Sequence, residues 1–482
     1  MTRGRSLGLL LALALLVTWH ARGLPLVRNS LVYARASEHV IAHGYDPRPV
    51  VADSALSYDK PILYAWVSAP FVRWLGNHDG LRVTSFLTTA AYLVALVAFA
   101  RAHRALLPPG GEQLVLWLAG FGPCVFYQFW SAHPDGAFAA LVTLAWALCR
   151  RITDEPGRDP RTVWALGVVV LVAVLLKNYG LILLGACPLY LLWHARAVRR
   201  RLLLHALAVF AVVAAFAGLA WAGLNPLSRL AGEGGGVGQY GRGELWVSAR
   251  GTWIQLGLAL ALQFTVCLAL VAWRRAWSRA LVPGLVCFAL PYVAGLMPFP
   301  TTFYNMRYFL PLFPPVALIV ARGLGALRPA LRRGLLGVHA VLAAALVLCF
   351  NVPEAYRLAA PVLPRLEVDW IRVPLSLLDN LRMPQHLEQA AVLARIDALP
   401  AGATLYLLDV NYYRDAQHGV YERAGLIRPD ITTRYVASRG FAPSEPVFFV
   451  LARRAPDLSA LGQVVELGPG LYRVERSNET AR

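Results

Sequence analysis

Long apolar segments separated by short basic turns fill the first three quarters of the chain. The first covers residues 6–24, and ten more lie near 82–100, 113–130, 137–149, 163–176, 178–194, 203–224, 252–273, 280–299, 308–327 and 334–352. A helix needs about 20 mostly apolar residues to cross a bilayer. The pattern therefore predicts a mostly α-helical, polytopic membrane bundle of about 11 transmembrane helices over residues 1–352.

Arginines gather at alternate ends of these segments, which sets the expected orientation. The outer turn at 131–136 holds no Lys or Arg, whereas basic clusters occur near 101–104, 150–161, 196–201, 274–279 and 322–333. Positively charged turns stay in the cytoplasm. With Arg3 and Arg5 preceding the first segment, we expect a cytoplasmic N-terminus. The segment could also be a signal peptide, but no small-x-small cleavage site follows it. Both interpretations place the following loop outside the cell.

The segments 163–176 and 178–194 are short and are separated by Lys177. Fourteen helical residues reach about 21 Å, which is less than a hydrocarbon core of about 30 Å. Because basic clusters flank the pair on both sides, we predict a hairpin with Lys177 at its tip, facing a polar cavity or an anion. A single kinked span with a snorkelling lysine is the alternative.

The first outer loop, within residues 25–80, is rich in titratable side chains between 29 and 60. Loops of this length in compact folds are often functional. The apolar stretch 61–75 is short and contains Arg73, so we expect an interfacial helix there. A second outer loop at 225–250 is rich in glycine without phosphate-loop spacing, and we expect a flap.

From about residue 353 the long apolar segments stop, while proline and charged residues increase. An odd number of crossings places residues 353–482 outside the membrane on the periplasmic face. The periodicity predicts a small extracytoplasmic α/β C-terminal domain, with a helix near 385–398 and strands near 403–409, 446–452 and 471–475. No catalytic spacing is evident in this part.

Composition supports a membrane protein, with 57% hydrophobic residues and 15% charged residues. The net charge of +19 is carried by arginines at segment ends, so we do not expect nucleic acid as a partner. All six cysteines lie in apolar segments, without disulfide or zinc spacing, and we predict no metal site. Of the 46 Lys and Arg residues, only Lys60 and Lys177 are lysines. These two positions either need a compact ammonium instead of a planar guanidinium, or kept lysine by chance.

Several short motifs follow one another along residues 1–330. The first outer loop carries Tyr33, Gly44 and the run from Tyr58 to Trp66, YDKPILYAW. Later motifs are Pro134-Asp135-Gly136, Lys177 in the short hairpin, and Arg307-Tyr308-Phe309-Leu310-Pro311. In this order the motifs resemble those of the GT-C glycosyltransferases, most closely the group of lipid A aminoarabinose transferases and protein O-mannosyltransferases.

The resemblance implies an inverting glycosyltransferase of the bacterial inner membrane that uses a polyprenyl-phosphate sugar as donor and needs no cofactor. The acceptor would be a lipid, glycan or protein at the outer face, and membrane lipids would surround the site. The leaving group is a phosphate, which Lys60, Lys177 and Arg307 would bind together. Sugar or acceptor contacts are expected from Tyr33, Tyr58, Tyr64 and His133, although tyrosine is also common at membrane interfaces and histidine is often only hydrogen-bonded.

One position departs from the family pattern. The catalytic acid is expected four residues before Tyr33, where this chain has Asn29, and an amide accepts no proton. Another carboxylate then serves as base, with Asp59, Asp135, Asp46 and Asp53 as candidates in that order, although Asp59 and Lys60 also fit a simple ion pair. Alternatively the acceptor is already ionised, or the protein binds lipid phosphate without turnover.

Two classes of function therefore remain open. The first is a glycosyltransferase, and the second is a non-enzymatic protein, either a lipid-phosphate binder with a degenerate site or a transporter. Transporters commonly contain repeated halves with matching broken helices. No such repeat relates residues 1–180 to 200–350, which favours the glycosyltransferase.

Overall fold

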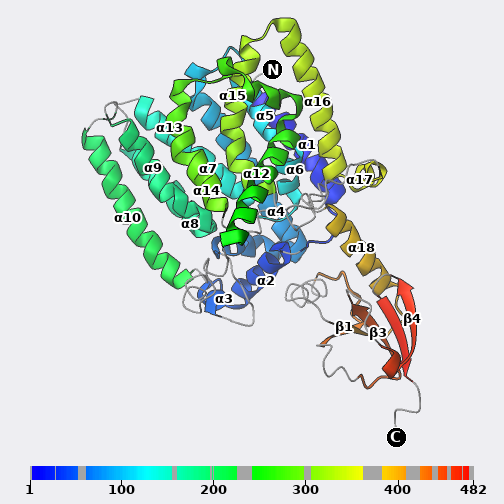
Figure 1. The fold of residues 1–482 in the computed structure, drawn as a ribbon. Coiled ribbons are helices and arrows are strands. Elements are labelled where there is room, and N and C mark those ends of the chain that lie inside the picture. The colour runs from blue at the N-terminus through cyan, green and yellow to red at the C-terminus, as the bar shows by residue number, and fades with distance from the viewer. Residues whose placement is uncertain are drawn as a thin grey trace.

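A bundle of helices with a small sheet at one end makes up the structure, a computed structural model (Figure 1). It describes residues 3–27, 29–52, 61–154, 160–195, 198, 200–224, 242–297, 306–361, 383–408, 424–436, 443–452, 458–468 and 471–476. The N-terminus lies at the end of the bundle opposite the sheet, while helices α2 and α3 lie at the same end as the sheet (Figure 1).

Eight helical segments among the described residues are long and apolar enough to cross a membrane. They coincide with eight of the eleven predicted segments. These eight are Arg3–Ala21, Leu63–Ala102, Asp135–Asp154, Arg200–Leu219, Ala249–Ala272, Arg279–Leu296, Met306–Ala326 and Pro329–Asn351.

The other three predicted segments do not form full-length spans, so the count of eleven is not confirmed. The segment 113–130 is divided into α5 (Gly111–Gly120) and α6 (Pro123–Trp130). At the break, a Cβ on Gly122 would lie 2.2 Å from the side-chain oxygen of Gln263, so a larger residue there would displace that side chain. The remaining two are α8 (Arg161–Leu176) and α9 (Leu181–Trp193), which are short.

The first outer segment is largely helical. It contains α2 (Asn29–Ala42) and α3 (Arg48–Ala52), where the sequence predicted a loop. After it, α4 (Leu63–Ala102) combines the predicted interfacial helix and the following span, with a sharp kink at Gly76, whose φ is 81°. Left-handed backbone of this kind suits glycine. The guanidinium of the buried Arg82 donates to the carbonyls of Arg22 and Leu24, which ties the kink to the end of α1 (Arg3–Ala21).

The predicted hairpin around Lys177 is present, and the alternative of one kinked span is wrong. The ring of Trp164 on α8 contacts His205 on α10 (Arg200–Leu224), and Gly167 lies against Val209. Residue numbers increase along both helices from the first contact to the second, so α8 and α10 run in the same direction. The intervening α9 therefore runs back, and Lys177 lies in the turn between α8 and the short helix η3 (Asn178–Gly180).

The later part of the bundle contains several irregular helices. The predicted flap 225–250 is helical from residue 242, and its earlier residues lie outside the described part of the chain. A π-helix, η8 (Leu285–Ala289), interrupts the span that ends with α14 (Leu290–Leu296). The other elements are α7 (Asp135–Asp154), α12 (Arg242–Phe264), α13 (Val282–Gly284), α15 (Phe313–Ala326), α16 (Pro329–Asn351), and the 3-10 helices Arg104–Leu106, Thr265–Ala272, Arg274–Ala276, Arg279–Leu281 and Met306–Leu312, the last of which is η10.

Beyond the bundle, α17 (Pro353–Ala359) and α18 (Met383–Asp397) lead to a five-stranded mixed sheet of order β2-β1-β3-β5-β4. The predicted helix and three strands appear as α18, β1 (Thr404–Leu408), β3 (Val447–Ala452) and β5 (Leu471–Arg476). Two further strands, β2 (Thr432–Val436) and β4 (Gly462–Gly468), were not predicted, and a 3-10 helix covers Ser459–Leu461.

Both faces of the sheet are packed. Leu405, Leu407 and Phe449 belong to the large apolar core that also contains Ile396 of α18. The alternate residues form a second, smaller core on the other face, made of Tyr406, Phe448, Val450, Leu458, Tyr472 and Val474. This alternation follows from the period of two along a strand, and it explains why the three apolar strands were recognisable in the sequence.

Helix α18 also reaches into the bundle. His386 is fully buried, its Nδ1 lies 2.8 Å from the carbonyl oxygen of Pro25, and its ring centroid is 4.8 Å from that of Trp130 on α6. The indole nitrogen of Trp130 donates to Asn351 of α16 at 3.1 Å, and the amide of Asn351 donates to the carbonyl of Pro123. Buried polar contacts therefore join α6 to both α16 and α18.

We expect Asn351→Leu to lower the free energy of unfolding by about 1–2 kcal/mol, because the buried indole of Trp130 loses its acceptor. Thermal unfolding of the purified protein in detergent measures the change. Leu348→Ala on the same helix is the matched control, since Leu348 is half exposed on the outer side of the bundle. Equal losses for the two variants would contradict the role given to the hydrogen bond.

Candidate functional site

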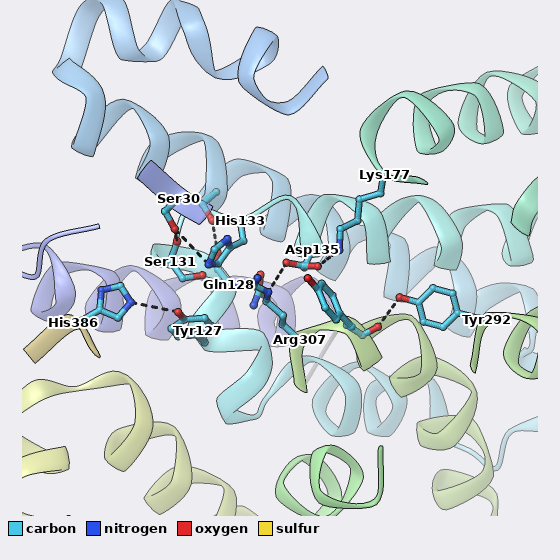
Figure 2. Close-up of polar contacts among 12 residues, drawn as sticks. Ser30, Tyr127, Gln128, Ser131, His133, Asp135, Lys177, Tyr292, Arg307 and His386 are labelled. Carbon is cyan, nitrogen blue, oxygen red and sulfur yellow. Dashed lines mark hydrogen bonds and ion pairs between the residues drawn. The ribbon is translucent and has the colours of Figure 1, made fainter. Parts of the chain in front are cut away.

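Asp135, the first residue of α7, binds two cations that come from distant parts of the sequence (Figure 2). Its Oδ1 accepts from the ammonium of Lys177, and its Oδ2 lies 3.0 Å from Nε of Arg307. The side chains of Asp135, Lys177 and Arg307 are only 3%, 12% and 4% exposed. We call these three residues the charged triad.

Local structure explains how each member of the charged triad is placed. Asp135 follows Pro134 and occupies the first turn of α7, where the helix dipole favours a negative charge. Lys177 has extended backbone, with φ of −150°, because α8 ends there and η3 begins. Arg307 is in η10, the tight helix that leads into α15. All three positions are therefore at interruptions of regular helix.

The charged triad has a net positive charge, because two cations share one carboxylate. Charges removed from water are costly unless they are paired and fully hydrogen-bonded. The Nη1 of Arg307 is buried and has no hydrogen-bond partner among the described residues. The site therefore has both the charge and the donor needed to bind an anion.

Aromatic rings surround the ammonium of Lys177. Its Nζ lies 4.2 Å from the ring centroid of Tyr308 and 5.7 Å from the centroids of both Phe138 and Tyr179. The hydroxyl of Tyr292 donates to the carbonyl of Tyr308 at 2.6 Å, which fixes η10 against α14. Cation–π contacts of this kind stabilise a desolvated ammonium, so the rings contribute to holding Lys177 in its place beside Asp135.

On the other side of the site, α2 packs against the first half of α4. The rings of Tyr33 and Tyr64 meet edge to face with centroids 5.0 Å apart. The hydroxyl of Ser37 lies within hydrogen-bonding distance of the carbonyl oxygens of Tyr33, at 2.8 Å, and Ala65, at 2.9 Å. Both tyrosines are buried, so α2 is a fixed wall of the site.

The turn between α6 and α7 connects α2 to the charged triad. Ser30, in the first turn of α2, donates its hydroxyl to the carbonyl of Ser131 at 2.6 Å, and its Oγ lies 3.4 Å from Nε2 of His133 (Figure 2). Ala132 between them has a left-handed backbone with φ of 59°. This conformation is unfavourable for alanine by roughly 1–2 kcal/mol, so the surrounding packing holds the turn in place.

The structure thus brings together several residues singled out in the sequence. Lys177 and Arg307 contact one carboxylate, His133 lies two residues before it, and Tyr33 and Tyr64 form one ring pair. The backbone of Asn29 begins α2 directly before Ser30. Four singled-out residues lie outside the described part of the chain, and their roles stay predictions: Asp53, Tyr58, Asp59 and Lys60.

Asp46 is in the short turn between α2 and α3, where it forms an ion pair with Arg48. Hydrogen bonds from Arg48 lower the pKa of the Asp46 carboxyl from its ordinary value. A carboxylate with a lowered pKa is a weaker proton acceptor. This contact makes Asp46 a poor candidate for the base.

Sequence reasoning missed Gln128 and Tyr127 on α6. Gln128 is fully buried, and neither its side-chain nitrogen nor its oxygen has a hydrogen-bond partner among the described residues. The hydroxyl of Tyr127 lies 3.3 Å from Nε2 of His386. A lone amide inside an apolar membrane segment is a signal of function, so Gln128 was recognisable; the contact to His386 spans 259 residues and was not.

Comparison with solved structures identifies the fold. Crystal structures of ArnT from Cupriavidus metallidurans match 98% of this chain and 98% of their own, at 15% sequence identity. The TM-score is 0.58 for ArnT bound to undecaprenyl phosphate and 0.54 for its apo state. No family model matches the sequence, and no curated protein does. The predicted fold, a polytopic bundle of membrane helices, is therefore confirmed, and the chain shares this fold with ArnT.

We expect Asp135→Asn to lower the free energy of unfolding by about 3–5 kcal/mol, because it leaves two buried cations without a counter-charge. Adding Lys177→Met should restore part of the loss, since one of those cations is removed. Thermal unfolding of the single and double variants measures both effects.

Asp154→Asn, at the other end of α7, is the matched control. Asp154 forms a partly exposed ion pair with Arg150, and exposed pairs contribute about 0–1 kcal/mol. Additive losses for Asp135→Asn and Lys177→Met would contradict the coupling within the charged triad.

Proposed function

We propose that the protein is a membrane glycosyltransferase that takes a sugar from a polyprenyl-phosphate donor and transfers it to an acceptor at the outer face of the bacterial inner membrane. The observation that carries this proposal is the convergence of Lys177 and Arg307 on one buried carboxylate, with a net positive charge. The fold shared with ArnT, one structure of which binds undecaprenyl phosphate, supports the same class of donor.

The charged triad suits a phosphate leaving group. When the bond between the sugar and the phosphate breaks, negative charge grows on the phosphate oxygens. Preorganised cations in a water-poor site stabilise such charge more strongly than water does. In this proposal Lys177 and Arg307 hold the phosphate, and Asp135 is a positioning residue that orients both cations. Lys60 would add a third cation from the first outer segment.

Orientation follows from the same scheme. The first outer segment and the sheet lie at one end of the bundle (Figure 1), and the charged triad is built where α7 begins and the α8–α9 hairpin turns. A donor embedded in the outer leaflet would present its phosphate at that level. We therefore place the N-terminus in the cytoplasm and residues 353–482 in the periplasm.

Asn29 is the observation that favours a second candidate, a lipid-phosphate binder without turnover. We expect the native chain in lipid nanodiscs to release undecaprenyl phosphate from an undecaprenyl-phosphate sugar, and Asn29→Asp to change that rate by less than about tenfold. Mass spectrometry of the released lipid measures it. Release that appears only after Asn29→Asp would instead support the binder with a degenerate site.

Binding of undecaprenyl phosphate tests the shared part of both candidates. We expect Lys177→Met and Arg307→Gln each to weaken binding by about 10–100-fold, because each removes a charge-assisted hydrogen bond. Native mass spectrometry in nanodiscs measures the bound fraction. Arg48→Gln is the control, since Arg48 is largely exposed and pairs with Asp46 away from the charged triad. Unchanged binding by both site variants would contradict the proposal.

A further inference from the structure

We infer that His133 is the general base of the proposed transfer reaction, with Ser30 as the positioning residue that sets its tautomer. The inference rests on the proposed function and deepens it, because it names the group that takes the proton from the acceptor. It starts from the contact between the first turn of α2 and the turn that precedes Asp135 (Figure 2).

The hydrogen bonds of Ser30 determine where the proton sits on His133. A hydroxyl has one proton, and Ser30 donates that proton to the carbonyl of Ser131 at 2.6 Å. Its contact with Nε2 of His133 at 3.4 Å is therefore donated by the imidazole. A neutral imidazole that carries its proton on Nε2 has its lone pair on Nδ1. Any hydrogen bond at Nδ1 must then be donated to it, as an acceptor hydroxyl would do.

The turn around His133 is built to hold the ring. Ser30, Ser131 and His133 are all buried, and the left-handed Ala132 redirects the chain so that His133 lies beside α2 and before α7. Strained backbone of this kind persists only where the surroundings impose it, and it concentrates at functional sites. His133 is thereby fixed two residues from the carboxylate of the charged triad.

Three described carboxylates, at the start of α7, on α2 and in the turn after α2, have other partners. Asp135 is shared by two cations, and Glu38 on α2 accepts from the amide of Asn77 at 2.7 Å. Asp46 is paired with Arg48. Among the described residues, His133 is a titratable side chain that contacts the first turn of α2, through Ser30.

The proton and charge balance of the step is favourable. The acceptor oxygen attacks the anomeric carbon, the bond from that carbon to the phosphate oxygen breaks, and its electron pair leaves with the polyprenyl phosphate. The acceptor proton passes to Nδ1 of His133. The donor has one negative charge, which the net charge of the charged triad matches, and the released phosphate has up to two. The imidazolium supplies the second positive charge as the phosphate gains its second negative one.

Titratable groups on several elements lie near the turn that holds His133. Tyr127 on α6 has its ring centroid 6.3 Å from that of His133, and its hydroxyl contacts His386 on α18. Asp135, which is paired with Arg307 of η10, follows His133 by two residues.

The test uses the full chain in nanodiscs, with undecaprenyl phosphate as the binding probe and undecaprenyl phosphate esterified to a pentose or hexose as donor. A lipid extract supplies the acceptor. We expect His133→Gln to lower the rate of undecaprenyl phosphate release by about 10²–10⁴-fold. Binding of undecaprenyl phosphate should stay within about threefold of the native chain, and the acid-side loss of rate that protonation of an imidazole base produces should disappear.

Ser30 gives a second, independent variant. Ser30→Ala should lower kcat by about tenfold and shift the acid limb without changing lipid binding, because the Nε2 proton loses its acceptor. Ser30→Thr keeps the hydroxyl and should restore the rate. His103→Gln is the matched control, since His103 is also a buried histidine but lies at the far end of α4.

Position 29 offers a test by rescue. It directly precedes Ser30 at the start of α2, so Asn29→Asp puts a carboxylate next in sequence to the positioning residue. Asn29→Asp introduced into His133→Gln should regain at least tenfold in rate. A native rate and acid limb in His133→Gln would overturn the role of His133 while leaving the transferase intact. Absence of both lipid binding and donor cleavage in the native chain would overturn the proposed function and this inference with it.

Discussion

The burial of two cations around a single carboxylate is the constraint on which the site depends. Lys177 and Arg307 are separated by 130 positions in the sequence, and each alone would be costly in a water-poor bundle. Their shared contact with Asp135 requires α7, the α8–α9 hairpin and η10 to meet at one level. The irregular helices near the site are the means by which the chain satisfies this requirement, because each cation lies where a regular helix stops.

Much of the bundle could be predicted from the sequence, because apolar length and arginine placement are direct physical signals. The hairpin at Lys177 followed from two short segments flanked by basic clusters. The division of 113–130 was missed, although Gly120, Gly122 and Pro123 are residues that commonly end and begin helices. In the C-terminal part, the strands with apolar alternation were recognisable, whereas β2, with the sequence TTRYV, and the exposed β4 were not.

The sequence indicated which residues belong to the site, but not which of them contact one another. Motif order singled out Asp135, Lys177 and Arg307, but it did not show that both cations contact this one carboxylate. The sequence did not indicate a role for Ser30, because a serine in a helix most often has no functional role. Its importance comes from a contact made across 103 positions with His133, and spacing along the chain does not reveal such contacts.

The insertion of His386 beside α6 has a consequence for biosynthesis. Helix α6 is made early, but its Trp130 indole finds its acceptor only on α16, and its Tyr127 hydroxyl meets His386 only on α18. A ribosome must therefore translate some 250 further residues before the polar groups of this early helix are all satisfied. The middle of the bundle therefore reaches its final packing only near the end of synthesis. In a chain truncated before α18, the buried polar groups of α6 would lack part of their hydrogen-bond partners.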